Sequence, residues 1–147
     1  MKAVQCTSYG PPENLEFNDI DDPQAGKGDV LIDIHATGLN FPDTLQIAGK
    51  YQFQPPFPFT PSSEVAGVIE AVGEGVTEVA VGDRVMAMIG VGGMAEKVAC
   101  PVGAITKIPD AMDFATASGF GMIYGTSYHA LKQRADLQAG ENLLVLG

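Results

Sequence analysis

Three polar side chains that could contact a ligand lie close together between residues 38 and 51. Asn40 and Asp43 are three positions apart, so they share one face of the first turn of a helix, and Tyr51 stands just beyond it. An amide, a carboxyl group and a phenol thus gather where a strand leads into a helix. On spacing alone, this arrangement predicts the floor of a pocket and no particular reaction.

The elements around this segment follow from two different periods of apolar residues. Residues 30–37 alternate, with Val30 and Ile32 on one side, which predicts a strand. After Gly38 the apolar positions take a helical spacing, and Gly49 is placed to end the helix. The polar side chains are therefore expected at a strand-to-helix junction.

Most of the remaining chain predicts β structure. Short runs with strand character are separated by turns rich in Gly, Pro and Asp, which is typical of a small barrel or sandwich. Besides residues 30–37, strands are expected at 1–8, 15–20, 65–72, 76–81, 84–88 and 94–99.

The pattern becomes helical after Pro109. Asp110 is placed to N-cap a first helix that ends near residue 118, with Asp113 at its third position. A second helix is expected over 122–134. The apolar run at 143–146 then predicts a buried parallel strand.

Composition bounds the class of protein and its partners. The chain has 147 residues, a net charge of −10 and only 8 Lys and Arg, which argues against nucleic acid or an anionic membrane as a partner. No apolar run reaches the length of a membrane span, so a cytoplasmic location is expected. Cys6 and Cys100 have no paired spacing, and we expect two free buried thiols.

Four motifs together resemble one known family along essentially the whole chain. The motifs are GLNFPD at 38–43, EVAGVIEAVG at 64–73, VGDRV at 81–85 and YGTSYHAL at 124–131. They are similar to the N-terminal, GroES-like catalytic domain of the medium-chain dehydrogenase/reductase superfamily, in its zinc-independent quinone oxidoreductase branch. The resemblance implies a mainly β fold, a partly open β-barrel with short flanking helices at 1–125. It implies that 126–147 begins the connection into a dinucleotide-binding Rossmann domain that is absent.

Metal ligands distinguish the branches of this superfamily. Where the zinc-dependent relatives have a Cys, this chain has Asn40, and Ser63 replaces the His that precedes the residue matching Glu64. No metal site is therefore expected, and Glu64 is expected to act as a structural hydrogen-bonding group. Without a Lewis acid the acceptor must delocalise the incoming charge itself, as quinones and α,β-unsaturated carbonyls do.

The resemblance also implies roles for individual residues, and for most of them a simpler structural role is the alternative. Asn40 would lie near the nicotinamide and the substrate oxygen, or only hold the turn. Tyr51 would orient a carbonyl or relay a proton, or pack as an aromatic, and Asp43 would act in catalysis or cap the helix. Thr126 would lie beside the nicotinamide ring, or only face the domain junction. Gly147 would be the first glycine of the phosphate-binding turn.

These implications lead to an expected function with one alternative. The expected parent protein is an NADPH-dependent, zinc-independent oxidoreductase that reduces a quinone or enone and forms a homodimer through the missing domain. The chain by itself is expected to be inactive, because the phosphate-binding turn follows Gly147. The alternative is a non-catalytic binding module or a co-chaperonin-like subunit.

Overall fold

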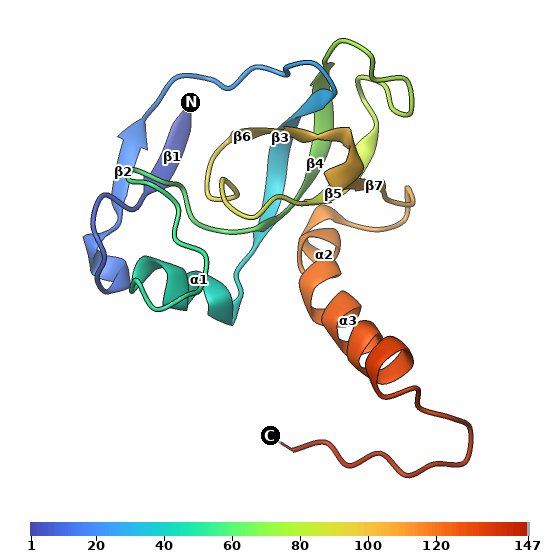
Figure 1. The fold of residues 1–147 in the computed structure, drawn as a ribbon. Coiled ribbons are helices and arrows are strands. Elements are labelled where there is room, and N and C mark those ends of the chain that lie inside the picture. Colours follow the sequence, from blue (N-terminus) through green and yellow to red (C-terminus); the bar gives the residue numbers. More distant parts are fainter. Residues whose placement is uncertain (147) are drawn as a thin grey trace.

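A computed structural model describes residues 1–146 of the chain, which form two antiparallel sheets and a helical C-terminal extension (Figure 1). A small sheet pairs β1 (Lys2–Gln5) with β2 (Glu16–Asp19). The larger sheet has the order β6-β3-β4-β5-β7. Its strands are β3 (Asp29–Gly38), β4 (Glu64–Val72), β5 (Arg84–Met88), β6 (Lys97–Pro101) and β7 (Ile105–Lys107).

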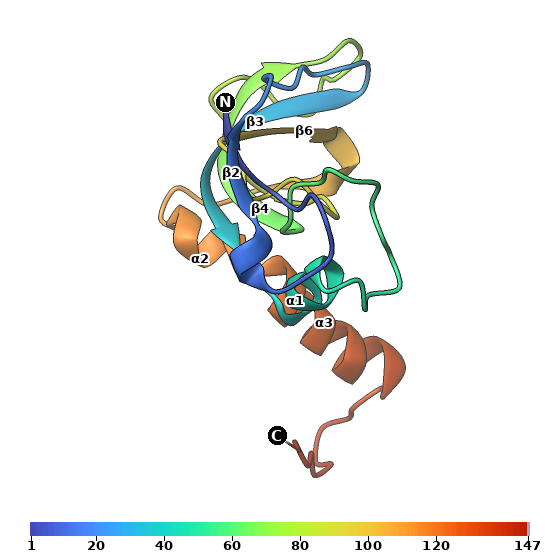
Figure 2. The same ribbon diagram turned by 90° about the vertical axis from the view of Figure 1, so that its left-hand side faces the viewer.

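The two sheets do not close into a barrel. Within the described residues, β6 and β7 are the unpaired edges of the larger sheet. Isolated bridges from Ala3 to Ala95 and from Cys6 to Phe59 join the small sheet to the rest (Figure 2). The mainly β, partly open architecture expected from the sequence is confirmed.

Residues of three neighbouring strands form most of the main core. The buried aliphatic side chains come chiefly from β3, β4 and β5, and Val30, Ile32, Val65, Ile69 and Val85 are each 0% exposed. The alternation predicted for 30–37 does not hold at its first positions, because Leu31 is buried as well. It holds from Ile32 to Ala36, where Asp33 and His35 are the exposed residues. Cys6 and Cys100 are buried and free, as expected, and burial raises the pKa of the Cys100 thiol to about 11.

The helix predicted after Gly38 is α1 (Phe41–Ile47). It begins at Asn40, whose N–H donates to the Asp43 carboxylate at 2.7 Å. The chain leaves the helix through Gly49, which has a φ of 67° that a residue with a side chain adopts only at a cost. The helix predicted from the change of period after Gly38, with its end at Gly49, is therefore confirmed.

Two predicted β elements differ from the structure. Residues 76–81 form a loop, not a strand, and their apolar members Val76 and Val79 pack against the core three positions apart. The predicted strand at 94–99 begins later, as β6, because residues 94–96 form an isolated bridge with β1 and pairing with β3 starts at Lys97. No pattern in the sequence indicated the short strand β7.

The first predicted helix starts at a different cap. The structure has α2 (Phe114–Ser118) with Asp113 as its N-cap, and the Asp113 carboxylate accepts from the Thr116 N–H at 2.8 Å. Asp110 is therefore not the cap. Its backbone carbonyl instead accepts from the Arg84 guanidinium at 2.7 Å, which holds residues 109–112 in a non-helical connection.

The second predicted helix is confirmed as α3 (Gly121–Tyr128), continued by a π-helical segment at His129–Arg134. The predicted strand at 143–146 is wrong for this structure, because these residues pair with no strand and Leu146 is 82% exposed. A buried parallel strand requires neighbours on both sides, and residues 1–146 provide none there.

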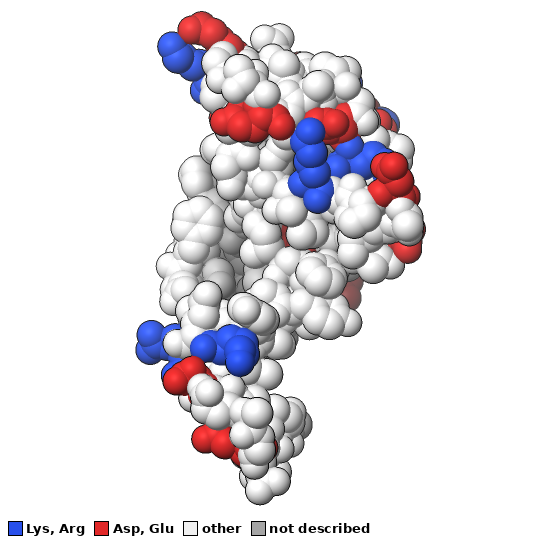
Figure 3. Space-filling view, turned by 90° about the vertical axis from the view of Figure 1, so that its right-hand side faces the viewer, with Lys and Arg blue, Asp and Glu red and all other residues white. Residues whose placement is uncertain are grey.

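The surface around α3 is largely uncharged. Figure 3 shows charged side chains gathered at the two ends of one face of the molecule, with uncharged surface between them. Ile123, Tyr124 and Tyr128 are each more than half exposed. Among the helices of the described residues, none is long and apolar enough to cross a membrane.

Candidate functional site

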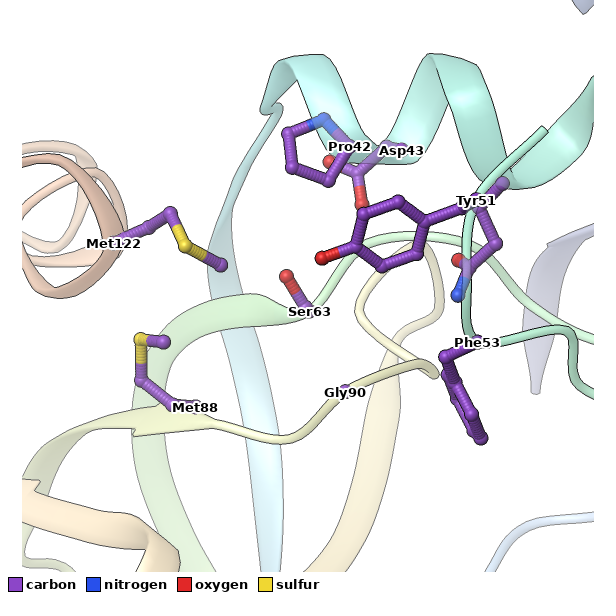
Figure 4. Close-up of a pocket in the computed structure, with 9 residues that line it drawn as sticks. Pro42, Asp43, Tyr51, Phe53, Ser63, Met88, Gly90 and Met122 are labelled. Carbon is purple, nitrogen blue, oxygen red and sulfur yellow. The ribbon is translucent and has the colours of Figure 1, made fainter. Parts of the chain in front are cut away.

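A cleft of about 230 Å³ lies where α1, the start of β4, the end of β5 and α3 come together (Figure 4). One wall comes from α1 and the loop that follows it, and the opposite wall comes from β5 and α3. The lining residues are Pro42, Asp43, Gln46, Tyr51, Phe53, Ser63, Met88, Gly90 and Met122. Two of the three polar residues singled out in the sequence, Asp43 and Tyr51, are thus brought together.

Two hydroxyl groups face the interior of this cleft. Figure 4 shows the Tyr51 hydroxyl directed towards Ser63, with Met88 and Met122 on the other side of the space. Within residues 1–146 neither hydroxyl makes a hydrogen bond. Both are therefore available to donate to an oxygen atom of a ligand between them and the methionines.

Asp43 forms part of the cleft wall and also caps α1. Its side chain is 7% exposed, and one carboxylate oxygen accepts from the Asn40 N–H at 2.7 Å. Burial raises the pKa of Asp43, the Asn40 N–H lowers it, and the nearby charge of Glu64 raises it further. The net direction is upward, which favours a carboxyl group that holds its proton to a higher pH than an exposed aspartate.

Asn40 lies at the N-terminus of α1 but does not line the cleft. Its side-chain Nδ2 donates to Glu64 Oε2 at 3.0 Å. In this structure the amide donor is thus used within the protein. A direct contact between Asn40 and a substrate or cofactor stays a prediction.

Glu64 is the buried polar group to which this amide is tied. The side chain is 1% exposed, and Oε1 accepts from the backbone N–H of Met122 at 2.8 Å. The hydrogen-bonding role expected for Glu64 is what the geometry shows. The carboxylate links the start of α1 to the first turn of α3.

The two remaining candidates are not in the cleft. Thr126 is an exposed residue of α3, one turn beyond Met122, and it does not line the cleft. Gly147 lies outside the described residues, so its expected role in a phosphate-binding turn stays a prediction. Within residues 1–146, no group of three His, Cys, Asp or Glu is arranged to hold a metal ion.

The sequence did not identify several of the residues that form the cleft. Gln46 is 3% exposed, and its Oε1 is buried with no hydrogen-bond partner among the described residues. Its spacing of three from Asp43 places it on the same face of α1, a signal that could have identified it. Met88 and Met122 carried no such signal, because only the fold brings the end of β5 next to α3.

Comparison with known proteins shows the family to which the chain belongs. Residues 26–110 match the alcohol dehydrogenase GroES-like domain family. Human quinone oxidoreductase is 40% identical over 149 residues, an alignment that covers 100% of this chain and 45% of that protein. The chain therefore spans less than half the length of this relative.

Solved structures show the same fold. The crystal structure of human synaptic vesicle membrane protein VAT-1 homolog-like protein matches with a TM-score of 0.93 and 36% identity, covering 95% of this chain and 45% of that one. Quinone oxidoreductase from Thermus thermophilus, solved also as its complex with NADPH, matches with a TM-score of 0.83 and 36% identity, covering 96% and 43%. The expected GroES-like fold is confirmed. The chain belongs to the alcohol dehydrogenase GroES-like domain family, in the quinone oxidoreductase branch of the medium-chain dehydrogenase/reductase superfamily.

Proposed function

We propose that this chain forms the acceptor-facing wall of the active site of an NADPH-dependent oxidoreductase that reduces quinones or α,β-unsaturated carbonyl compounds. The observation that carries the proposal is the cleft in which the free hydroxyls of Tyr51 and Ser63 face the thioethers of Met88 and Met122. Relatives named quinone oxidoreductase support the reaction class, and the Thermus complex supports the cofactor.

The two sides of the cleft suit the two parts of such a reaction. Hydride addition to a conjugated carbonyl builds negative charge on the carbonyl oxygen, and hydroxyl donors placed at that oxygen stabilise the charge. Tyr51 and Ser63 provide these donors, and the Tyr51 hydroxyl is also suited to pass a proton to the oxygen. The methionine side chains exclude water and contact a flat ring through polarisable sulfur.

The lining residues fit only one end of NADPH. Met88 and Met122 offer an apolar surface for the nicotinamide ring, which when bound supplies the hydride. Among the described residues, no Lys or Arg lines the cleft, while Asp43 adds a carboxyl group that would repel phosphates. We therefore assign the ring end of the cofactor to this cleft and its phosphates to residues outside the cleft.

The test is NADPH oxidation by the complete product of the natural gene, with a 1,4-benzoquinone, an enone and an aldehyde as parallel acceptors. Each is assayed with and without a metal chelator. We expect chelator-resistant turnover of the quinone or the enone. Aldehyde turnover that the chelator abolishes would overturn the proposal, and so would an absence of turnover with all three acceptors.

Two variants connect the activity to this cleft. Tyr51→Phe with Ser63→Ala removes both hydroxyl donors, and we expect kcat to fall by about 100-fold, the usual loss for an oxyanion donor. Tyr9→Phe is the matched control, because the Tyr9 hydroxyl bonds Gln54 on the surface and does not line the cleft. An unchanged kcat in the double variant would place the reaction elsewhere.

A further inference from the structure

The Glu64 carboxylate is held by two hydrogen bonds and is closely approached by two glycines. Its two oxygens accept from Asn40 Nδ2 at 3.0 Å and from the Met122 N–H at 2.8 Å. A Cβ atom added at Gly38 would lie 3.1 Å from Oε2, and one added at Gly121 would lie 3.2 Å from Oε1. Two positions without side chains thus let β3 and α3 approach the carboxylate closely.

These contacts are the polar anchor of α3. No residue of α3 is buried, and Tyr124 and Tyr128 are more than half exposed, so this helix has little apolar packing to fix its position. The bond to Glu64 is made at the Met122 backbone, and the Met122 side chain forms the cleft wall opposite Tyr51. The position of that wall therefore depends on Glu64.

We propose that Glu64 is a positioning residue that sets the width of the cleft, and that Asn40 acts through Glu64 and not by touching the substrate. The inference rests on the proposed oxidoreductase function and names the groups that shape its acceptor site. A small displacement of a wall near reacting atoms lowers the rate strongly, so the effect should be visible in kcat.

The polarity of the Asn40–Glu64 bond allows a direct test. Asn40→Asp places a carboxylate against the Glu64 carboxylate and loses the bond, because neither group then has a donor. Glu64→Gln alone can keep the bond, because each of the two amides carries both a donor and an acceptor. The double variant restores it with donor and acceptor exchanged: the Gln amide donates to Asp, and the Gln oxygen still accepts from Met122. The total charge of the pair matches that of the natural protein.

Two readouts are measured on the complete gene product. Amide hydrogen exchange at Met122, followed after selective methionine labelling, reports the anchor itself. We expect exchange at Met122 about tenfold faster and kcat about tenfold lower in Asn40→Asp, with both values largely recovered in the double variant. Glu70→Gln is the control, because Glu70 lies on the same strand and bonds Lys97 on the surface.

The outcomes separate this inference from the proposed function. If no acceptor is reduced, the function fails, while the exchange measurements still test the anchor. Unchanged Met122 exchange in Asn40→Asp would overturn the inference, and so would a double variant no better than Asn40→Asp. If Asn40→Asp does not fold, Asn40→Ser keeps an N-capping side chain and removes the amide. It should then accelerate Met122 exchange in the same way.

Discussion

At the scale of single residues, Asp43 links pH to folding. Its pKa lies above the ordinary value of 3.8, first because burial disfavours the charged form. The folded state therefore binds this proton more tightly than the unfolded state does. As pH rises past the ordinary value, the unfolded state ionises first, and the Asp43 contribution to stability decreases until the folded carboxyl group has also ionised.

Replacing Asp43 by Asn should remove this pH-dependent loss. The free energy of unfolding of Asp43→Asn, relative to the natural chain, should increase as pH rises from about 3 to about 7. Urea titrations across this range measure the difference. Asp21→Asn, in an exposed loop, is the control. A difference that is constant with pH would contradict the prediction.

At the scale of elements, Arg84 connects β5 to α2. Its guanidinium donates to the backbone carbonyls of Pro109, Asp110 and Met112 at 3.0, 2.7 and 2.6 Å. It also lies 4.5 Å from the centre of the Phe114 ring. The planar, forked guanidinium can serve several carbonyls and one ring face together, which a lysine cannot do.

Arg84→Lys should therefore destabilise the chain although it preserves the charge. We expect a loss of about 2 kcal/mol, because more than one carbonyl loses its donor. Chemical denaturation measures it, and Lys27→Met is the control, since the Lys27 pair with Glu74 is exposed and should contribute less than about 1 kcal/mol. Equal stability of both variants would show that the segment at 109–112 needs no such support.

The sequence predicted the elements whose signals are local. The change of period after Gly38 and the glycine at the end of α1 depend only on nearby residues, and the helix they predicted was confirmed. Asp113 was misjudged because Arg84, distant in sequence, binds the carbonyls before α2. Residues 76–81 have strand-like composition but pack as a loop over the core.

The same distinction applies to the candidate site. Asp43 and Tyr51 were found because they lie in one short segment with a clear change of period. The partner of Asn40 is Glu64, 24 positions later, and the second donor to Glu64 is Met122, 58 positions beyond it. Such contacts result from how β3, β4 and α3 meet in space, which no local pattern encodes.

At the scale of the whole molecule, an exposed apolar surface lies on the C-terminal extension. A hollow of about 510 Å³ along α3 and the segment after it is lined by Phe120, Tyr124, Gly125, Ser127, Tyr128 and Leu131. The apolar residues 143–146 are also exposed. Contiguous apolar surface of this kind is typical of an interface rather than of a free surface.

The chain of 147 residues should therefore associate in solution as its concentration rises. Tyr124→Glu with Tyr128→Glu should abolish the association, because two carboxylates would be buried in the contact. Sedimentation equilibrium measures the mass. Phe17→Glu, which alters an exposed aromatic on β2, should leave the association intact. A monomer at every concentration would contradict the prediction.

The shared Glu64 carboxylate also limits how this domain can be recombined with its relatives. Gly38 and Asn40 come before the loop at 52–58, whereas Glu64 and Gly121 come after it. A chimaera joined within that loop takes the two halves of the arrangement from different parents. It would keep the anchor of α3 only if both parents have the same residues at these four positions, so useful junctions for exchanging parts of this domain lie before residue 38 or after residue 122.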